Sequence, residues 1–542
     1  MKYLLAICFA FVCLNMFAQN VSQVWVADNK NGTFKNPVIN ADYSDPDAIR
    51  VGDDFYMVSS SFNHIPGLPI LHSKDLVNWK LIGHALKRQP PFEHFSTVQH
   101  GGGVWAPSIR YHKNEFYIYY PDPDFGIYLT KAKNINGPWS QPILVEAGKG
   151  LIDPCPLWDD NGKVYLTHAY AGSRAGIKSI LVVKEMNKEG TKTISDPGLV
   201  FDGRETDPTV EGPKFYKRNG YYYIFAPAGG VSTGWQLVLR SKNIYGPYER
   251  KVVMDQGSST VNGPHQGAWV TTQTGEDWFL HFQDKDAYGR VVHLQPMSWK
   301  NDWPVIGVDK DGDGKGEPVM VYKKPNVGKT YPVATVADSD EFNSPKLGLQ
   351  WQWQANPLQY WAMPTPNGFL RMFSVQKSDS LVSAWNLPNI LGQKTVADEF
   401  TATTKISFQP KWEGERFGLI VFGADYAAVS IIKKKDGNYI SFVSCKEADR
   451  GKKETVQDGE KLNSKDIYLR VKVTKGALCE FSYSEDGTSF KTIGEQLKAK
   501  PGRWVGAKVG MFFTRENKTN DAGVADVDWF RVNSPLPTSP EG

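Results

Sequence analysis

The sequence predicts an all-β fold, a five-bladed β-propeller followed by a β-sandwich. Five segments of one shape recur, each with an anchor residue, a hydrophobic stretch, a Gly or Asn turn and an aromatic strand. The anchors are Asp45 in YSDPDA, Trp105 in VWAPSIRY, Asp153 in LIDPCP, Glu211 in TVEGPK and His265 in PHQGAW. Successive anchors lie about 48 to 60 residues apart, which suits one four-stranded blade per repeat. Blades around one axis would aim the start of every first strand at a shared point, where the three acids would converge.

We expect three segments along the chain. Residues 1–18 carry one Lys, an apolar run of about a dozen residues and a small residue at Ala18, the pattern of a secretory signal peptide. The propeller is expected over residues 30–325. Residues 323–342 are polar with two prolines, as is typical of a linker, and residues 336–535 hold nine or more strand candidates with hairpin turns, which favours a sandwich. The leader predicts export, to the periplasm or out of the cell, and no other apolar run is long enough for a membrane span.

Composition excludes some partners and leaves others open. The net charge of +4 with 22% charged residues gives no basic surface for nucleic acid or anionic membrane. Aromatic residues reach 13%, and their rings stack well on sugars, although large all-β proteins also carry many aromatics in strands. Cys8 and Cys13 leave with the leader, so Cys155, Cys445 and Cys479 remain. An odd number is no disulfide framework, and whether Cys445 and Cys479 pair stays open.

The three acids suggest a chemistry. Two carboxyl groups across a sugar-sized gap, one ionised and one protonated, are the minimum for hydrolysis of a glycosidic bond. A third carboxylate would raise the pKa of the acid by like-charge repulsion. An isolated DP or EGP is usually a turn, whereas three acids at matching positions in repeated units indicate a pocket. Asp47 lies two residues after Asp45 and could share its face, so spacing alone does not choose between them.

The loop DKDGDGKGEP resembles the first half of a calcium loop. Asp309, Asp311, Asp313 and Gly314 match, but position twelve is Met320 where a bidentate Glu is required. A solvated Gly-rich hairpin is the favoured reading. A structural calcium ion would be compatible with the chain, and no cofactor is expected for catalysis.

Several longer motifs resemble glycoside hydrolase family 43, in particular its β-xylosidases and α-L-arabinofuranosidases. They are NPVINADYSDPDAIRVGDDFYMVSSSF, PILHSKDLVNW, GGGVWAPSIRYHKNEFYIYY, LIDPCPLWDDNGKVYL, VEGPKFYKRNGYYYI and YGRVVHLQPMSW. The resemblance covers nearly everything after the leader. It implies a five-bladed propeller, a companion sandwich domain of the concanavalin-like jelly-roll type, and an inverting hydrolysis without a metal.

The resemblance also implies roles for residues. Asp45 matches the general base, Glu211 the general acid, and Asp153 the residue that modulates pKa and orients. Four further positions match residues that bind the sugar or line its pocket: Phe62, Trp105, His265 and Arg290. His265 is expected on or near the axis, where it could order water, touch a central ion or be a satisfied structural histidine.

For the substrate, the resemblance favours exo-acting release of α-L-arabinofuranosyl residues from side chains of plant hemicellulose such as arabinoxylan or xyloglucan. The departure of SFNHIPG from the form common in xylosidases points weakly the same way. A β-xylosidase acting on xylo-oligosaccharides is the alternative within the family. From another class, a carbohydrate-binding propeller without catalysis is the rival, and five-bladed fructosidases are disfavoured because Gly212 follows Glu211.

Overall fold

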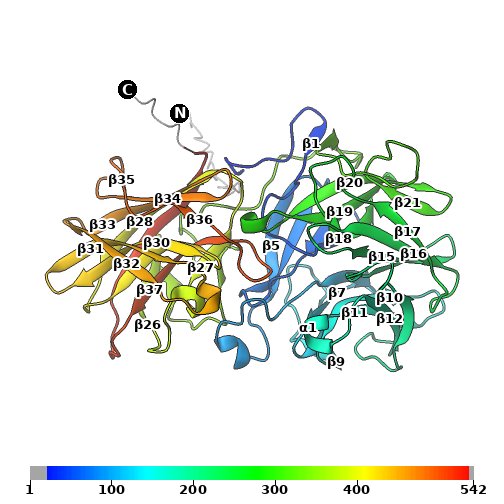
Figure 1. The fold of residues 1–542 in the computed structure, drawn as a ribbon, viewed down its shortest axis with the longest axis horizontal. Coiled ribbons are helices and arrows are strands. Elements are labelled where there is room, and N and C mark those ends of the chain that lie inside the picture. Colours follow the sequence, from blue (N-terminus) through cyan, green and yellow to red (C-terminus); the bar gives the residue numbers. More distant parts are fainter. Residues whose placement is uncertain (1–20, 536–542) are drawn as a thin grey trace, which may run out of the picture.

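A computed structural model describes residues 21–535, and the expected leader at 1–18 lies outside this range. The chain forms two β-domains that lie side by side (Figure 1). The N-terminal domain, blue to green, is the five-bladed propeller, and the C-terminal domain, yellow to red, is the sandwich. Both predictions of fold class are confirmed.

Each blade is a four-stranded antiparallel sheet whose strands follow one another in sequence. Tight turns between alternating or aromatic strands make such a meander the local outcome. The strands of blades one and two are β2 (Asp47–Val51), β3 (Asp54–Val58), β4 (Gly67–Ser73), β5 (Trp79–Leu86), β6 (Ser108–His112), β7 (Glu115–Asp122), β8 (Gly126–Ala132) and β9 (Ile143–Ala147). Those of blades three to five are β10 (Leu151–Trp158), β11 (Val164–Tyr170), β12 (Ile180–Met186), β13 (Gly198–Asp202), β14 (Lys214–Arg218), β15 (Tyr221–Ala228), β16 (Trp235–Ser241), β17 (Glu249–Met254), β18 (His265–Thr271), β19 (Asp277–Asp284), β20 (Arg290–Lys300) and β21 (Trp303–Ile306).

The first strands of the blades meet around the axis. β18 contacts β2, β2 contacts β6, β6 contacts β10, and β10 contacts β14. Every anchor of the sequence repeat lies at or just before one of these strands. The predicted convergence of segments far apart in sequence is therefore what the fold produces. A short sheet of β1 (Thr33–Lys35) with β22 (Val321–Lys323) joins the start of the propeller to its end.

The sandwich packs two eight-stranded sheets, and residues 324–351 before it hold no helix or strand. One sheet contains β23 (Gln352–Trp353), β26 (Val375–Gln376), β27 (Leu391–Lys394), β29 (Arg416–Phe422), β30 (Tyr426–Lys434), β31 (Gly437–Cys445), β32 (Thr455–Leu462) and β37 (Lys508–Arg515). The other contains β24 (Ala362–Pro364), β25 (Leu370–Phe373), β28 (Phe400–Gln409), β33 (Asp466–Thr474), β34 (Leu478–Ser484), β35 (Lys491–Thr492), β36 (Leu497–Lys498) and β38 (Val524–Asn533). Cys445 in β31 and Cys479 in β34 thus lie in different sheets, and both are free and buried.

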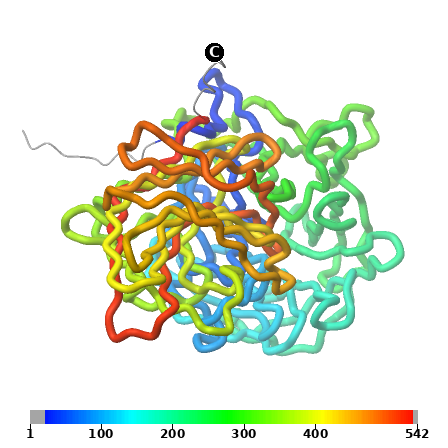
Figure 2. Tube along the Cα trace, turned by 60° about the vertical axis from the view of Figure 1, so that its left-hand side comes forward, coloured from blue at the N-terminus to red at the C-terminus, as the bar shows by residue number. Residues whose placement is uncertain are grey.

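The two domains share one apolar core. A single cluster of buried side chains runs from propeller residues such as Phe55 and Trp278 to sandwich residues such as Trp353 and Phe417. Figure 2, in which the sandwich comes forward, shows it lying across the propeller. Backbone hydrogen bonds cross the boundary, with Trp353 paired to Ile65 and Ala507 donating to Ala287. Irregular segments with short helices also face this boundary, among them η1 (His94–Ser96), η2 (Asp286–Tyr288), η3 (Ala384–Asn386) and η4 (Ala448–Arg450). Within residues 21–535, no helix has the length and apolar character to cross a membrane.

Candidate active site

Asp45 precedes β2 in a constrained backbone. Its φ is +56°, in the left-handed region that non-glycine residues avoid, and Pro46 fixes the next torsion. The Ser60 hydroxyl donates a 2.5 Å hydrogen bond to Oδ2 of Asp45, and the Ser60 amide donates to the Ser44 carbonyl at 3.1 Å. The carboxylate is therefore held in one orientation, although it is 6% exposed and can still meet water.

Asp153 lies inside β10 at a break in the ladder. The pairing of β10 with β11 shifts register between Ile152 and Cys155, and φ of Asp153 is +58°. This bulge turns the carboxylate out of the sheet toward the strand of Glu211, where the Gly212 amide donates to Oδ2 of Asp153 at 2.7 Å. Two of the three acids are thus tied together through backbone.

The three acids form one electrostatic group. Burial, followed by the negative charge of Glu211 and then that of Asp45, raises the pKa of Asp153 to about 8, while the Gly212 amide and Lys214 oppose the rise. Because carboxyls that repel one another titrate as a group, the raised pKa belongs to a cluster in which Asp153 favours its protonated form. Asp153, expected to perturb the pKa of a neighbouring acid, is thus itself the perturbed group.

Glu211 has a histidine partner. Its Oε1 lies 3.1 Å from Nε2 of His265, the residue that opens β18. The side chain of Glu211 is 28% exposed, whereas that of His265 is 1% exposed. His265 therefore contacts Glu211 directly, a partner that none of the three readings left open from the sequence named. Glu211 is the member of the cluster that a bound molecule can reach most freely.

Arg290 opens β20 beside Asp45. Its Nη1 lies 3.7 Å from Oδ1 of Asp45, and its Nε lies 4.0 Å from Asp284. The guanidinium also lies 5.0 Å from the Phe282 ring and 5.7 Å from the Trp504 ring. This contact to Trp504 brings a residue of the sandwich into the site.

Aromatic rings wall the same region. Phe62 and Trp105 pack edge to face at 6.4 Å, and Trp105 packs against Trp504 at 6.3 Å. The Trp105 indole donates to the Gly101 carbonyl at 2.6 Å, which fixes the ring. Phe62 is buried, whereas Trp504 is 46% exposed. All seven predicted site residues thus lie in one region, and Trp504 joins them from the second domain.

A cavity of about 810 Å³ opens beside the acids, at the boundary of the two domains. Propeller residues that line it include Gln99, Arg174, Asp284 and Arg290, and sandwich residues include Trp385, Asp449, Arg503 and Trp504. None of the three acids lines this cavity, but Arg290 does, and its Nη1 lies 3.7 Å from Oδ1 of Asp45, so the cavity adjoins the cluster at this arginine. Its size is that of a site for a small ligand or a short oligosaccharide.

Asp47 is set apart from this cluster. It is fully buried, and its Oδ2 accepts hydrogen bonds from the Ile109 amide at 2.8 Å and from Arg110 Nη1 at 2.6 Å. A carboxylate without access to solvent cannot activate water. The geometry therefore favours Asp45 over Asp47 as the base, as the resemblance implied.

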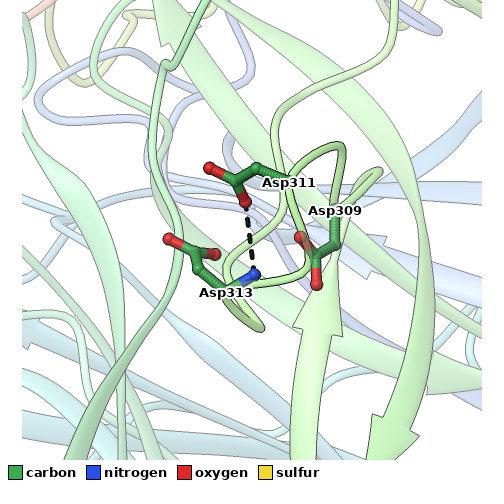
Figure 3. Close-up of side chains that lie close together, drawn as sticks. All are labelled: Asp309, Asp311 and Asp313. Carbon is green, nitrogen blue, oxygen red and sulfur yellow. Dashed lines mark hydrogen bonds between the residues drawn. The ribbon is translucent and has the colours of Figure 1, made fainter.

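The acidic loop lies in a surface turn. Asp309, Asp311 and Asp313 offer carboxylate oxygens within 4.8 Å of one another (Figure 3). However, the two oxygens of Asp309 accept hydrogen bonds from the Gly312 and Gly314 amides, and Asp311 accepts one from the Asp313 amide. The loop therefore satisfies its own carboxylates as a solvated hairpin would, and we assign it no function.

Comparison with known families agrees with this geometry. Residues 34–304 match the model of glycosyl hydrolases family 43, and residues 339–533 match a β-xylosidase C-terminal concanavalin A-like domain. The chain belongs to glycosyl hydrolase family 43. It is a glycosidase of that family, with the family's concanavalin-like sandwich fused to its propeller.

Curated relatives cover nearly the whole chain. A protein of Xylanibacter ruminicola, provisionally named a β-xylosidase, is 41% identical over 90% of this chain and 87% of its own. A β-xylosidase of Formosa agariphila is 33% identical over 93% of this chain and 90% of its own. A non-reducing end α-L-arabinofuranosidase of Bacteroides ovatus is 30% identical over 92% of this chain and 94% of its own.

Proposed function

We propose that this family 43 glycosidase is an exo-acting β-xylosidase that shortens xylo-oligosaccharides from plant hemicellulose. The observation that carries the chemistry is the convergence of Asp45, Asp153 and Glu211 in one cluster, in which burial and like charges raise the pKa of Asp153. One carboxyl group can then donate a proton while another accepts one, as inverting hydrolysis of a glycoside requires.

In this mechanism Asp45 is the general base. Ser60 orients its carboxylate, which takes a proton from a water molecule on the face of the sugar opposite the leaving group. Arg290, beside Asp45, binds a sugar hydroxyl with its guanidinium.

Glu211 is the general acid. Being more exposed than Asp153, it delivers the proton of the pair to the leaving oxygen. Repulsion between the carboxyls of Asp153 and Glu211 retains a proton on the pair, and Asp153 orients the backbone at Glu211 through the Gly212 amide. His265 holds Oε1 of Glu211 toward the axis. The first product has inverted anomeric configuration.

The choice of sugar follows the relatives. The two most similar of the three carry β-xylosidase names, and the family match of the sandwich is to a β-xylosidase domain. This support favours xylose over the arabinofuranose that the sequence analysis preferred. Release of α-L-arabinofuranose remains the second candidate, because the Bacteroides ovatus arabinofuranosidase is 30% identical over almost the full length. The apolar leader at residues 1–18 supports export to the periplasm or the medium.

Rates on paired substrates test the proposal. We expect kcat/KM on 4-nitrophenyl β-D-xylopyranoside and on xylotriose to exceed that on 4-nitrophenyl α-L-arabinofuranoside, with xylose as the first product of xylotriose. Faster release of arabinose, from the aryl substrate and from arabinoxylan oligosaccharides, would select the second candidate. Binding without release of any pentose would select the non-catalytic propeller.

A further inference from the structure

A buried polar network follows the acids along their own strands. Asp47 comes two residues after Asp45, and Cys155 comes two residues after Asp153. Arg110 of β6 joins the two, because its Nη1 donates to Oδ2 of Asp47 at 2.6 Å and its Nη2 donates to Sγ of Cys155 at 2.7 Å. One guanidinium therefore bridges the strand of the proposed base and the strand of the second acid.

The network reaches the strand of Glu211 as well. Cys155 Sγ accepts a second hydrogen bond, of 3.2 Å, from the amide of Phe215. Lys214, next to Phe215, donates from Nζ to the Pro107 carbonyl at 3.1 Å. The neighbouring Tyr216 lies under Arg110, with the guanidinium 5.5 Å from its ring, and its hydroxyl accepts the amide of Trp269 in the fifth blade. The first strands of all five blades thus meet through one set of side chains.

The network is buried, and its members differ in charge. The side chain of Asp47 is 0% exposed and that of Arg110 is 14% exposed. Burial alone would lower the pKa of Arg110, but the negative charge of Asp47 outweighs it and raises the pKa overall, so the guanidinium is charged. Burial raises the pKa of Cys155, so the thiol is neutral. A buried ion pair contributes little net stability, since desolvation offsets attraction. The contribution of the Asp47–Arg110 pair is therefore to the position of the strands and not to the stability of the fold.

We propose that Arg110 is a positioning residue that sets the spacing of Asp45, Asp153 and Glu211 through Asp47 and Cys155. This inference rests on the roles proposed above for the three acids. The planar guanidinium fork fixes the directions of both hydrogen bonds, which a lysine ammonium cannot do. An error of about 1 Å in the placement of catalytic groups costs on the order of a hundredfold in rate.

Three variants test the proposal on the full-length enzyme. Cys155→Ala removes the sulfur acceptor alone, Arg110→Lys keeps the charge without the fork, and Asp47→Asn with Arg110→Met removes both charges so that neither is left unpaired. Ser108→Ala is the control, because Ser108 lies on β6, is as buried as Asp47 and Cys155, and its hydroxyl has no hydrogen-bond partner within residues 21–535. Activity of all variants is measured at one temperature, below the lowest of their melting temperatures, so that only folded enzyme is compared at equal temperature.

We expect kcat on xylotriose and on the aryl xyloside to fall about 10- to 100-fold in all three variants, with KM changed less than about twofold. The control should keep the wild-type kcat. The proposal would be overturned if Cys155→Ala and whichever Arg110 variant folds had a lower melting temperature but the wild-type kcat. That result would show that the network has a structural role only. A wild-type enzyme that releases no pentose would instead reject the proposed function.

Discussion

Oδ2 of Asp42, in the propeller, accepts a 2.9 Å hydrogen bond from the backbone amide of Gly506, in the sandwich. Its other oxygen accepts the amide of Arg290, also at 2.9 Å. One buried carboxylate therefore fixes both the arginine beside Asp45 and the loop that carries Trp504. The sandwich completes the site, which distinguishes it from an appended binding module on a flexible linker.

Loss of the general acid should depend on the leaving group. A good leaving group departs without a proton, whereas a sugar hydroxyl does not. We expect Glu211→Ala to lower kcat/KM about 10²- to 10⁴-fold on xylotriose and much less on 4-nitrophenyl xyloside. Asp45→Ala should reduce both about equally, since activation of water is needed for either. Equal losses for the two substrates in Glu211→Ala would remove Glu211 from the acid role.

The stereochemistry should be that of a single displacement. With Asp45 activating water opposite the leaving group, a β-xyloside gives α-xylose first. Proton NMR within the first minutes, before mutarotation, should show the α-anomer ahead of the β-anomer. Early β-xylose would mean that one of the carboxylates attacks the sugar itself.

Much of this site could be predicted from the sequence because the repeat marks it. The frame of Asp45, Asp153 and Glu211 recurs at blade length, and a propeller brings equivalent positions together whatever their separation along the chain. His265 and Trp105 followed from the same frame, since His265 begins the first strand of its blade and Trp105 lies just before one.

Other contacts could not be predicted, for physical reasons. Trp504 lies in a loop without periodicity, and its place beside Arg290 depends on how two domains dock. The partnership of Arg110 with Cys155 joins strands of neighbouring blades and needs side-chain directions that alternation alone does not give. Ser60 carried a weak signal, as one of three serines after β3, but which serine faces Asp45 depends on the local turn.

The raised pKa of Asp153 predicts an unusual dependence of stability on pH. The folded protein holds a proton that an unfolded Asp, with a pKa of 3.8, releases. The free energy of unfolding should therefore fall as the pH rises from about 4 to about 8. Asp153→Asn removes this contribution, so its melting temperature should fall less than that of the wild type between pH 5 and pH 8.

Differential scanning fluorimetry of the wild type and Asp153→Asn across that range measures the difference between their melting temperatures at each pH. Contributions from other titrating groups are common to both proteins and cancel in this difference. Parallel curves would show that Asp153 ionises normally in the folded protein. The same variant should move the alkaline limb of kcat/KM to lower pH, because the repulsion between two carboxyls that retains a proton on the pair is gone.

The contact at Gly506 predicts that a single methyl group disturbs catalysis from the second domain. A Cβ at Gly506 would lie 2.6 Å from the backbone nitrogen of Gly289, the residue before Arg290. Overpacking of this kind costs about 1–3 kcal/mol, and it would push the Trp504 loop away from the propeller. We expect Gly506→Ala to lower the melting temperature by several degrees and kcat/KM on xylotriose by at least about tenfold. Gly83→Ala, where the added Cβ meets nothing within 4 Å, should change neither. A destabilised Gly506→Ala with unchanged kcat/KM would show that docking of the sandwich matters to stability and not to the site.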